Sequence, residues 1–156
     1  MDTAQVYRTG QYCFAPMQAG DVELVLRIEQ GIYAFPWTRG NFEDSLASGY
    51  TAWLMRDGKQ LVGYAVMMNI LDEAHLLNIS IIPARQHGGL GSLMLESLCI
   101  EARGHGAVRM ILEVRASNIV GRAFYQHHGF LPIGERSGYY PAEHGREAAM
   151  VLEKRI

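Results

Sequence analysis

Residues 79–92 read ISIIPARQHGGLGS, and they bring three local signals into direct succession. The isoleucines before Pro83 are typical of a strand, the glycines permit a tightly curled loop, and the apolar spacing from Leu90 onward predicts a helix. A curled loop can point several backbone N–H groups inward, and a helix start adds further donors and the positive end of the helix dipole. The stretch therefore predicts a site for a pyrophosphate. The alternative is that the glycines only end one element and begin the next.

The spacing excludes two common nucleotide-binding motifs. A Walker loop needs lysine followed by serine or threonine at the helix start, whereas residues 90–92 are Leu-Gly-Ser. A dinucleotide-binding fingerprint that begins at Gly89 would need glycine or alanine where Met94 stands. The pattern Gln-x-x-Gly-x-Gly does fit when it begins at Gln86. A competing register begins at Arg85, and we prefer Gln86 because its register uses both later glycines.

The segments on either side of this loop predict a mixed α/β fold. Three β-rich runs in close succession, with the turn-forming pair Asp57-Gly58 between the first two, indicate an antiparallel meander. A strand–helix–strand–helix pattern follows, which indicates a mixed sheet with helices on both faces. The expected strands are 11–17, 51–56, 61–70, 74–82, 109–115, 131–139 and 147–153, and the expected helices are 21–31, 38–46, 90–104 and 118–129.

Length and composition are those of an ordinary globular domain. The 156 residues, 49% hydrophobic and 19% charged, predict a single domain over residues 1–156. A net charge of −2 argues against binding to nucleic acid or an anionic membrane through bulk electrostatics. Residues 1–10 contain no apolar core of a signal peptide, so we expect a cytoplasmic protein without direct nucleic-acid or membrane partners.

Cys13 and Cys99 do not make a disulfide framework and are expected to be buried thiols.

Glu113 is the most informative single residue. It lies in the strand 109–115, whose central residues are otherwise apolar on both faces, as in a strand covered by helices on both sides. A carboxylate loses hydration there unless it is paired, and such an environment suits a general base. The alternative is a structural salt bridge with Arg115, which lies two residues further on the same face.

Several segments together resemble the GNAT superfamily of N-acetyltransferases. The loop that begins at Gln86 resembles the coenzyme A pyrophosphate loop of that superfamily. Further segments narrow the resemblance to bacterial ribosomal-protein alanine N-acetyltransferases, over about residues 21–153. These segments are AFPW (34–37), LDEA (71–74), NI (78–79), LEVRASN (112–118), GFL (129–131) after Tyr125, YYP (139–141) and GRE (145–147).

The resemblance implies a fold, a co-substrate and a reaction. The fold would be a GNAT fold with a central mixed seven-stranded sheet that splays between its fourth and fifth strands. The co-substrate would be acetyl-CoA, with no metal. The acceptor would be the α-amino group of a protein N-terminus, and most specifically the N-terminal alanine of a small-subunit ribosomal protein. We expect the amine to attack directly in a ternary complex, because Cys13 and Cys99 lie outside the segments that resemble the active site. We also expect a monomer or a weak dimer.

The same resemblance implies roles for individual residues. Glu113 would be the general base, and Tyr125, otherwise a packed aromatic, would be the general acid that protonates the leaving thiolate. Asn118, a natural N-cap, would also touch the coenzyme. The strand residues Ile79, Ser80 and Ile81 would pair with pantetheine, a backbone N–H near Ile79 would polarise the thioester carbonyl, and the diphosphate would lie on Gln86, His87, Gly88, Gly89, Leu90, Gly91 and Ser92. Acceptor-binding positions would be Asp72, Glu73, Tyr139 and Tyr140, with the two acids equally interpretable as turn residues.

Two other functions stay open at this point. One is an acetyltransferase for a small-molecule amine, and the other is a non-catalytic module that senses acyl-CoA. Glu113 and Tyr125 together favour an enzyme, because a binding module has no need of both. The six histidines do not indicate a metal site, since His127 and His128 diverge on a helix and there is no HExxH motif. We interpret His144, near the expected acceptor channel, as a solvated loop residue.

Overall fold

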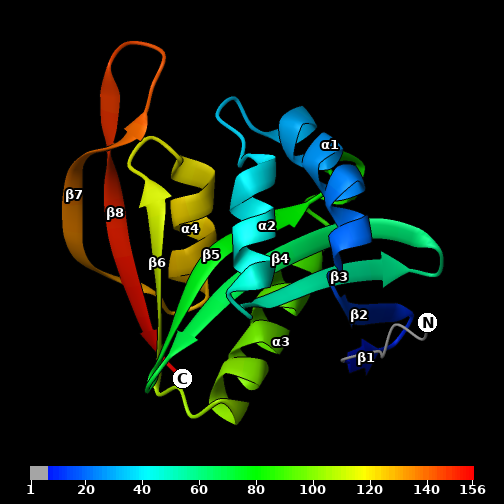
Figure 1. Ribbon diagram of the computed structural model, residues 1–156. Coiled ribbons are helices and arrows are strands. Elements are labelled where there is room, and N and C mark those ends of the chain that lie inside the picture. Colours follow the sequence, from blue (N-terminus) through cyan, green and yellow to red (C-terminus); the bar gives the residue numbers. More distant parts are fainter. Residues whose placement is uncertain (1–6) are drawn as a thin grey trace. The chain divides into compact units, whose positions relative to one another are not determined.

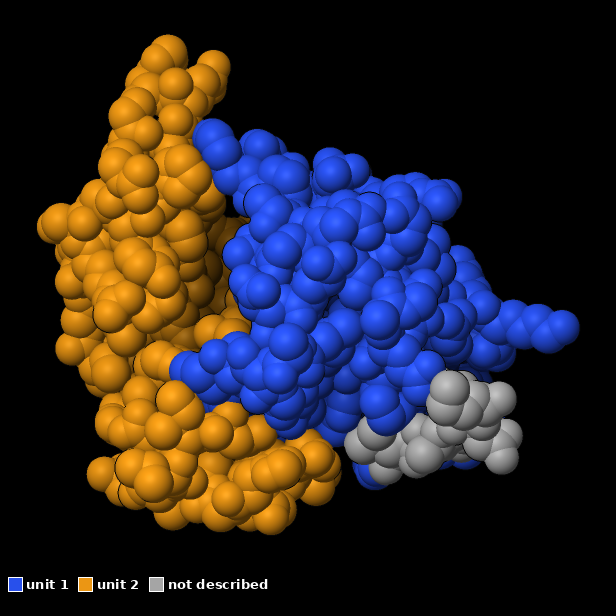
Figure 2. Space-filling view, in the orientation of Figure 1, with its two compact units in different colours: residues 1–68, 78–98 blue, residues 69–77, 99–156 orange. Residues whose placement is uncertain are grey.

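The structure, a computed structural model, describes residues 7–156. Residues 1–6, part of the segment expected to lack a signal peptide, lie outside the described residues. The described chain divides into two compact units, coloured separately in Figure 2. The first comprises the described residues up to Met68 together with Asn78–Leu98, and the second comprises Asn69–Leu77 and Cys99–Ile156. That the chain forms a single domain stays a prediction.

Eight strands form a mixed sheet in the order β1-β2-β3-β4-β5-β6-β8-β7, in agreement with the expected mixed α/β class. The strands are β1 (Tyr7–Thr9), β2 (Tyr12–Pro16), β3 (Thr51–Asp57), β4 (Gln60–Ile70), β5 (Glu73–Ile81), β6 (Arg109–Arg115), β7 (Leu131–Pro141) and β8 (Arg146–Arg155). The helices are α1 (Val22–Ile32), α2 (Arg39–Ala47), α3 (Leu90–Gly104) and α4 (Ile119–His127), with two 3₁₀ turns, η1 (Ala19–Asp21) and η2 (Pro83–Arg85).

The expected number of seven strands is wrong by one. The additional strand is β1, which pairs antiparallel with β2 through a tight turn. Gly10 lies in that turn at φ +56°, a conformation that glycine adopts without steric cost. A strand of three residues is too short to produce an alternating pattern in the sequence, so periodicity did not reveal it.

In the first unit, helices cover both faces of β4. Successive strand residues point to opposite faces of a sheet, so Gly63 and Tyr64 lie on opposite faces of β4. The ring of Tyr64 lies edge-on to Phe42 of α2, with centroids 6.0 Å apart. On the other face, a Cβ added to Gly63 would lie 3.0 Å from Met94 Cε of α3. In Figure 1, α1 and α2 lie together on one side of β3 and β4.

In the second unit, β6 is the central strand, as its apolar pattern predicts. Its first residues pair in parallel with Glu73–Leu76 of β5, and its whole length pairs antiparallel with β8. Met110, Ile111, Leu112 and Val114 are all buried. Strands β7 and β8 form a long hairpin whose connecting loop projects beyond the end of β6 (Figure 1). The splay expected between the two strands of this parallel pair, β5 and β6, stays a prediction.

Helix caps and turns follow the local chemistry with one exception. Thr38 caps α2 as expected, because its hydroxyl oxygen accepts a hydrogen bond from the Asn41 N–H at 3.1 Å. Gly58, at φ +60°, lies in the tight turn between β3 and β4. Asp21 stands at the N-cap of α1, but its carboxylate accepts from the Gln18 N–H at 2.8 Å and so closes the preceding turn η1.

Two smaller expectations concern the cysteines and the membrane. Neither Cys13 nor Cys99 forms a disulfide; Cys99 is buried as expected, whereas Cys13 is only half-buried because it lies on β2, near the edge of the sheet. Among residues 7–156, no helix is long and apolar enough to cross a bilayer.

The close packing over β4 gives a stability prediction. In Gly63→Ala the new Cβ would lie 2.7 Å from the Ser80 carbonyl oxygen, which is backbone and cannot rotate away. We expect a loss of about 1–3 kcal/mol in the free energy of unfolding, measured by urea titration. Gly134→Ala is the matched control, since a Cβ there meets nothing within 4 Å. Equal stability of the two variants would contradict this packing.

Candidate functional site

The predicted anion loop follows β5 directly in the first unit. The Ile82 N–H donates to the Val62 carbonyl at 2.9 Å and fixes the end of the strand, after which η2 turns the chain. The Gln86 side-chain amide donates back to the Ile81 carbonyl at 3.0 Å. Residues 86–89 are exposed. The Gln86 side chain therefore holds the loop to the strand, while the loop backbone stays accessible to a ligand.

The loop backbone has the geometry of an anion-binding nest. His87 has φ +63° and Gly89 has φ +86°, with Gly88 between them outside the left-handed region. Alternating hand turns backbone N–H groups toward a common concavity. The Gly89 carbonyl accepts from the Leu93 N–H at 3.1 Å, so α3 begins at once and presents its N-terminal end to the same place. This donor set, made of main-chain amides and a helix start, fits a diphosphate.

A buried carboxylate beneath the strand was missed by sequence reasoning. Glu29 of α1 is 2% exposed and accepts three hydrogen bonds: from the Tyr64 hydroxyl at 2.7 Å, the Asn78 side-chain amide at 3.1 Å and the Trp37 N–H at 2.9 Å. Burial and the neighbouring Glu29 charge raise the pKa of Tyr64 far above its ordinary value. The sequence did contain a clue to its burial, because Glu29 follows Val22 and Val25 at helical spacing on the buried face of α1.

The Glu29 cluster continues to the strand residues expected to bind pantetheine. The Ser80 hydroxyl donates to the Asn78 side-chain carbonyl at 2.7 Å, and it also hydrogen-bonds with the Tyr33 hydroxyl at 2.7 Å. The Tyr33 hydroxyl donates to the Ile79 carbonyl at 3.4 Å. Burial raises the pKa of Tyr33, so this phenol stays protonated at neutral pH. Ile79 and Ser80 are thus held by a continuous polar network that extends from Glu29.

In the second unit, Glu113 lies among groups supplied by β7. Its side chain is 18% exposed. One carboxylate oxygen accepts from the Tyr139 hydroxyl at 3.2 Å, and the other forms an ion pair with Arg136 at 3.5 Å. Arg115, the partner considered from the sequence, forms its ion pair with Glu147 at 2.9 Å. Glu113 is therefore a paired carboxylate whose partners lie on a neighbouring hairpin.

Tyr139 and Tyr140 lie together beside Glu113, with ring centroids 4.9 Å apart. Burial and the charge of Glu113 raise the pKa of both phenols, that of Tyr140 to about 12. Both are therefore protonated at neutral pH, and Tyr139 acts as a hydrogen-bond donor. The guanidinium of Arg136 lies 5.1 Å from the Tyr139 ring centroid, and that of Arg115 lies 4.5 Å from the Tyr140 ring centroid. The sequence did not indicate Arg136 as a site residue, because its place next to Glu113 depends on the register of the β7–β8 hairpin.

Two predicted site residues belong to α4 and its start. The Asn118 side-chain oxygen accepts from the Gly121 N–H at 2.9 Å, which confirms the N-cap. A Cβ on Gly121 would lie 2.5 Å from the Asn118 amide nitrogen, so a larger residue there would displace the capping side chain. Tyr125 is half-buried and packs against Phe130, with ring centroids 5.6 Å apart. Coenzyme contact by Asn118 and acid catalysis by Tyr125 stay predictions.

Asp72 and Glu73 lie at the beginning of the parallel pair. The Asp72 carbonyl accepts from the Val108 N–H at 2.8 Å, and Glu73 forms an ion pair with Arg109, which also pairs with Glu153. Glu73 is level with Arg109, four residues before Glu113 along β6, which corresponds to about 13 Å of strand. The contacts of both acids thus stabilise the sheet. A part in acceptor binding stays a prediction.

A family comparison agrees with this arrangement. The model described as "Acetyltransferase (GNAT) family" matches residues 22–130, well over half of the chain. The chain belongs to the GNAT acetyltransferase family. This confirms the superfamily predicted from the loop that begins at Gln86.

Relatives within the GNAT family cover almost the whole chain. The [Ribosomal protein bS18]-alanine N-acetyltransferase of Escherichia coli strain K12 is 35% identical over 136 residues, which are 87% of this chain and 92% of the relative. The enzyme of the same name from Haemophilus influenzae is 35% identical over 137 residues, 87% of this chain and 93% of its own. This similarity confirms the narrower resemblance seen in the sequence.

Solved GNAT structures show the same fold. The crystal structure of the ribosomal-protein-S18-alanine N-acetyltransferase from Escherichia coli superposes with a TM-score of 0.86 and 33% identity, over 93% of this chain and 94% of that one. A GNAT family acetyltransferase from Elizabethkingia anophelis, solved with acetyl-CoA bound, has a TM-score of 0.77 at 18% identity, over 95% and 100% of the two chains. The second similarity concerns the fold alone.

The Glu29 cluster gives a second stability prediction. In Glu29→Gln, an amide N–H₂ replaces one of two oxygens that both face donors, so at least one buried donor loses its acceptor. We expect a loss of about 1–3 kcal/mol in the free energy of unfolding, measured by urea or thermal unfolding. Glu43→Gln, an exposed change on α2, is the control and should be neutral. Unchanged stability of Glu29→Gln would show that this carboxylate does not organise the strand.

Proposed function

We propose that this protein transfers the acetyl group of acetyl-CoA to the α-amino group of a protein N-terminus, specifically the N-terminal alanine of ribosomal protein bS18. The observation that carries the proposal is the near-complete match to enzymes of that name, combined with a paired Glu113 carboxylate next to two protonated tyrosines. Acetyl-CoA supplies an activated acetyl thioester. All remaining roles belong to residues of this chain.

The residues of the first unit hold and polarise the donor. The main-chain amides of residues 87–89 and the start of α3 bind the diphosphate, with Gln86 keeping the loop on its strand. The backbone of Ile79, Ser80 and Ile81 pairs with the pantetheine amides as an added strand would. The Ile79 N–H polarises the thioester carbonyl and stabilises negative charge on its oxygen in the transition state.

The residues of the second unit handle the acceptor and the protons. Glu113 takes a proton from the acceptor ammonium, directly or through a water molecule, and frees the nitrogen lone pair for attack. Tyr125 donates its phenolic proton to the departing coenzyme A sulfur. Tyr139 and Tyr140 line the acceptor side, where Tyr139 already reaches the Glu113 carboxylate. No covalent acetyl-enzyme is part of this route.

The acid–base assignment predicts the effect of two conservative substitutions. Glu113→Gln removes the proton acceptor and Tyr125→Phe removes the proton donor, while each keeps the shape of the side chain. We expect each to lower kcat for acetyl transfer by about 10²- to 10⁴-fold, measured with saturating acetyl-CoA and an alanine-starting peptide. Glu135→Gln, exposed on β7, and Tyr50→Phe are the controls. If both catalytic variants kept wild-type rates, the assignment of Glu113 as base and Tyr125 as acid would be wrong.

The acceptor assignment is tested by a panel of amines. A peptide with the bS18 N-terminus should be acetylated with a kcat/KM at least about tenfold above those of polyamines and aminoglycosides, because its first residues contribute binding that small amines lack. Preference for a polyamine would overturn the protein-substrate assignment.

Direct attack predicts that neither thiol carries the acetyl group. A Cys13→Ala, Cys99→Ala double variant should therefore retain turnover. Complete loss of turnover in the folded double variant would refute direct attack.

A further inference from the structure

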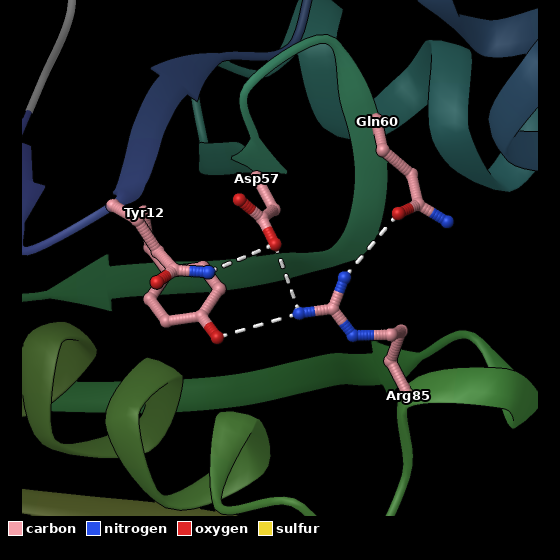
Figure 3. Close-up of polar contacts among 5 residues, drawn as sticks. Tyr12, Asp57, Gln60 and Arg85 are labelled. Carbon is pink, nitrogen blue, oxygen red and sulfur yellow. Dashed lines mark hydrogen bonds and ion pairs between the residues drawn. The ribbon is translucent and has the colours of Figure 1, made fainter.

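Arg85 is a cation at the entrance to the diphosphate loop whose side chain leads away from that loop. It ends η2 and immediately precedes Gln86. Its guanidinium donates to the Asp57 carboxylate at 3.0 Å, to the Gln60 side-chain oxygen at 3.2 Å and to the Tyr12 hydroxyl at 3.3 Å. Figure 3 shows the side chain directed at these three residues of β2, β3 and β4.

The cluster around Arg85 is a network rather than a single surface ion pair. Asp57 ends β3 and is paired with Gln60 across the tight turn to β4. The same Asp57 oxygen that binds Arg85 accepts from the Gln11 side-chain amide at 3.0 Å. The Arg85 and Asp57 side chains are only 27% and 25% exposed. The hydrogen bond to Asp57 raises the pKa of Arg85 above its ordinary value. These contacts therefore fix the orientation of the Arg85 guanidinium toward Asp57, Gln60 and Tyr12.

The loop that follows needs external support for its backbone. His87 holds a left-handed φ of +63°, which a residue with a Cβ adopts at a cost in free energy. The Gln86 side chain attaches the loop to β5, and α3 fixes its far end. Arg85 supplies the attachment on the near side, because it joins η2 to the turn between β3 and β4. The Arg85 carbonyl also lies 3.6 Å from where a Cβ on Gly88 would stand, so the two residues pack closely.

We propose that Arg85 is a positioning residue for coenzyme A, which holds the diphosphate loop in its binding conformation through Asp57 and does not itself contact the phosphates. The inference rests on the proposed function and adds to it a residue outside the Gln-x-x-Gly-x-Gly pattern. A preorganised loop binds its ligand without the entropic cost of ordering, so loss of the attachment weakens binding. Asp57, far from the loop in sequence, is then as necessary as Arg85 itself.

The decisive experiment compares Arg85→Gln with Asp57→Asn. Coenzyme A binding is measured by calorimetry, and KM for acetyl-CoA and kcat are measured by steady-state acetylation of the alanine-starting peptide. We expect each variant to raise the Kd for coenzyme A and the KM for acetyl-CoA by about tenfold, the size of one lost charged hydrogen bond. The kcat at saturating acetyl-CoA stays within about twofold, because the reacting groups are untouched. The effects of the two substitutions in the double variant are not additive.

Two further measurements separate positioning from a direct charge effect and from a general loss of structure. Arg85→Lys keeps the charge but not the planar group that makes the three contacts, so it behaves like Arg85→Gln. S-Acetylpantetheine is an acetyl donor that lacks the diphosphate. Its kcat/KM is therefore the same in wild type, in Arg85→Gln and in Asp57→Asn. Arg56→Gln is the matched control, since Arg56 on β3 donates to the Lys59 carbonyl at 3.2 Å and its loss removes one positive charge from the same hairpin.

Three results of the coenzyme A binding measurements would overturn the inference. If Arg85→Gln weakens coenzyme A binding while Asp57→Asn binds it as tightly as wild type or more tightly, Arg85 is a phosphate ligand. If wild type binds coenzyme A and both variants bind it equally well, the attachment has no role. If wild type itself gives no heat with coenzyme A, the proposed function fails and the inference fails with it. Should Arg85→Gln not fold, Tyr12→Phe removes one contact only and shows the same direction of change at a smaller size.

Discussion

The left-handed backbone at His87 and Gly89 is the constraint on which the first unit depends for its chemistry. Left-handed residues turn neighbouring backbone N–H groups toward one concavity, so the fit to a diphosphate depends on the positive φ of these two residues. Each neighbouring feature maintains that conformation: Gln86 ties the loop to Ile81, and α3 starts directly after Gly89. Even the meander contributes, because its first turn carries the Asp57 that binds Arg85. The sheet thus serves to hold a short piece of main chain.

The charges of the second unit are arranged in pairs around Glu113. The carboxylate meets a phenol and a guanidinium from β7, and the neighbouring Arg115 is engaged by Glu147. The hydrogen bond with Arg115 lowers the pKa of Glu147, so this pair persists in mildly acidic solution. The contacts from Tyr139 and Arg136 engage both oxygens of the Glu113 carboxylate and fix the orientation of the side chain. Glu113 and Glu147 thus pair with two different arginines, Arg136 and Arg115.

Local sequence patterns predicted much of this structure, and long-range contacts account for what they missed. Strand β6 was predicted with its observed bounds because a compact apolar run lies between arginines. Asn118 was readable as a cap, since capping depends only on residues within one turn. In contrast, the partners of Arg85 and Glu113 come from distant segments whose register no local pattern encodes. Glu29 was overlooked because a glutamate on an apolar face is buried only where other elements supply donors.

Amide NMR is the most direct test of main-chain recognition of the diphosphate. Uniformly ¹⁵N-labelled protein is titrated with coenzyme A while the backbone amide resonances are followed. Main-chain recognition predicts that the largest chemical-shift changes fall on His87, Gly88, Gly89 and Leu90, with the Arg85 side-chain resonance almost unchanged. Saturable binding of coenzyme A with no response from these amides, or with the dominant change at the Arg85 guanidinium, would contradict it.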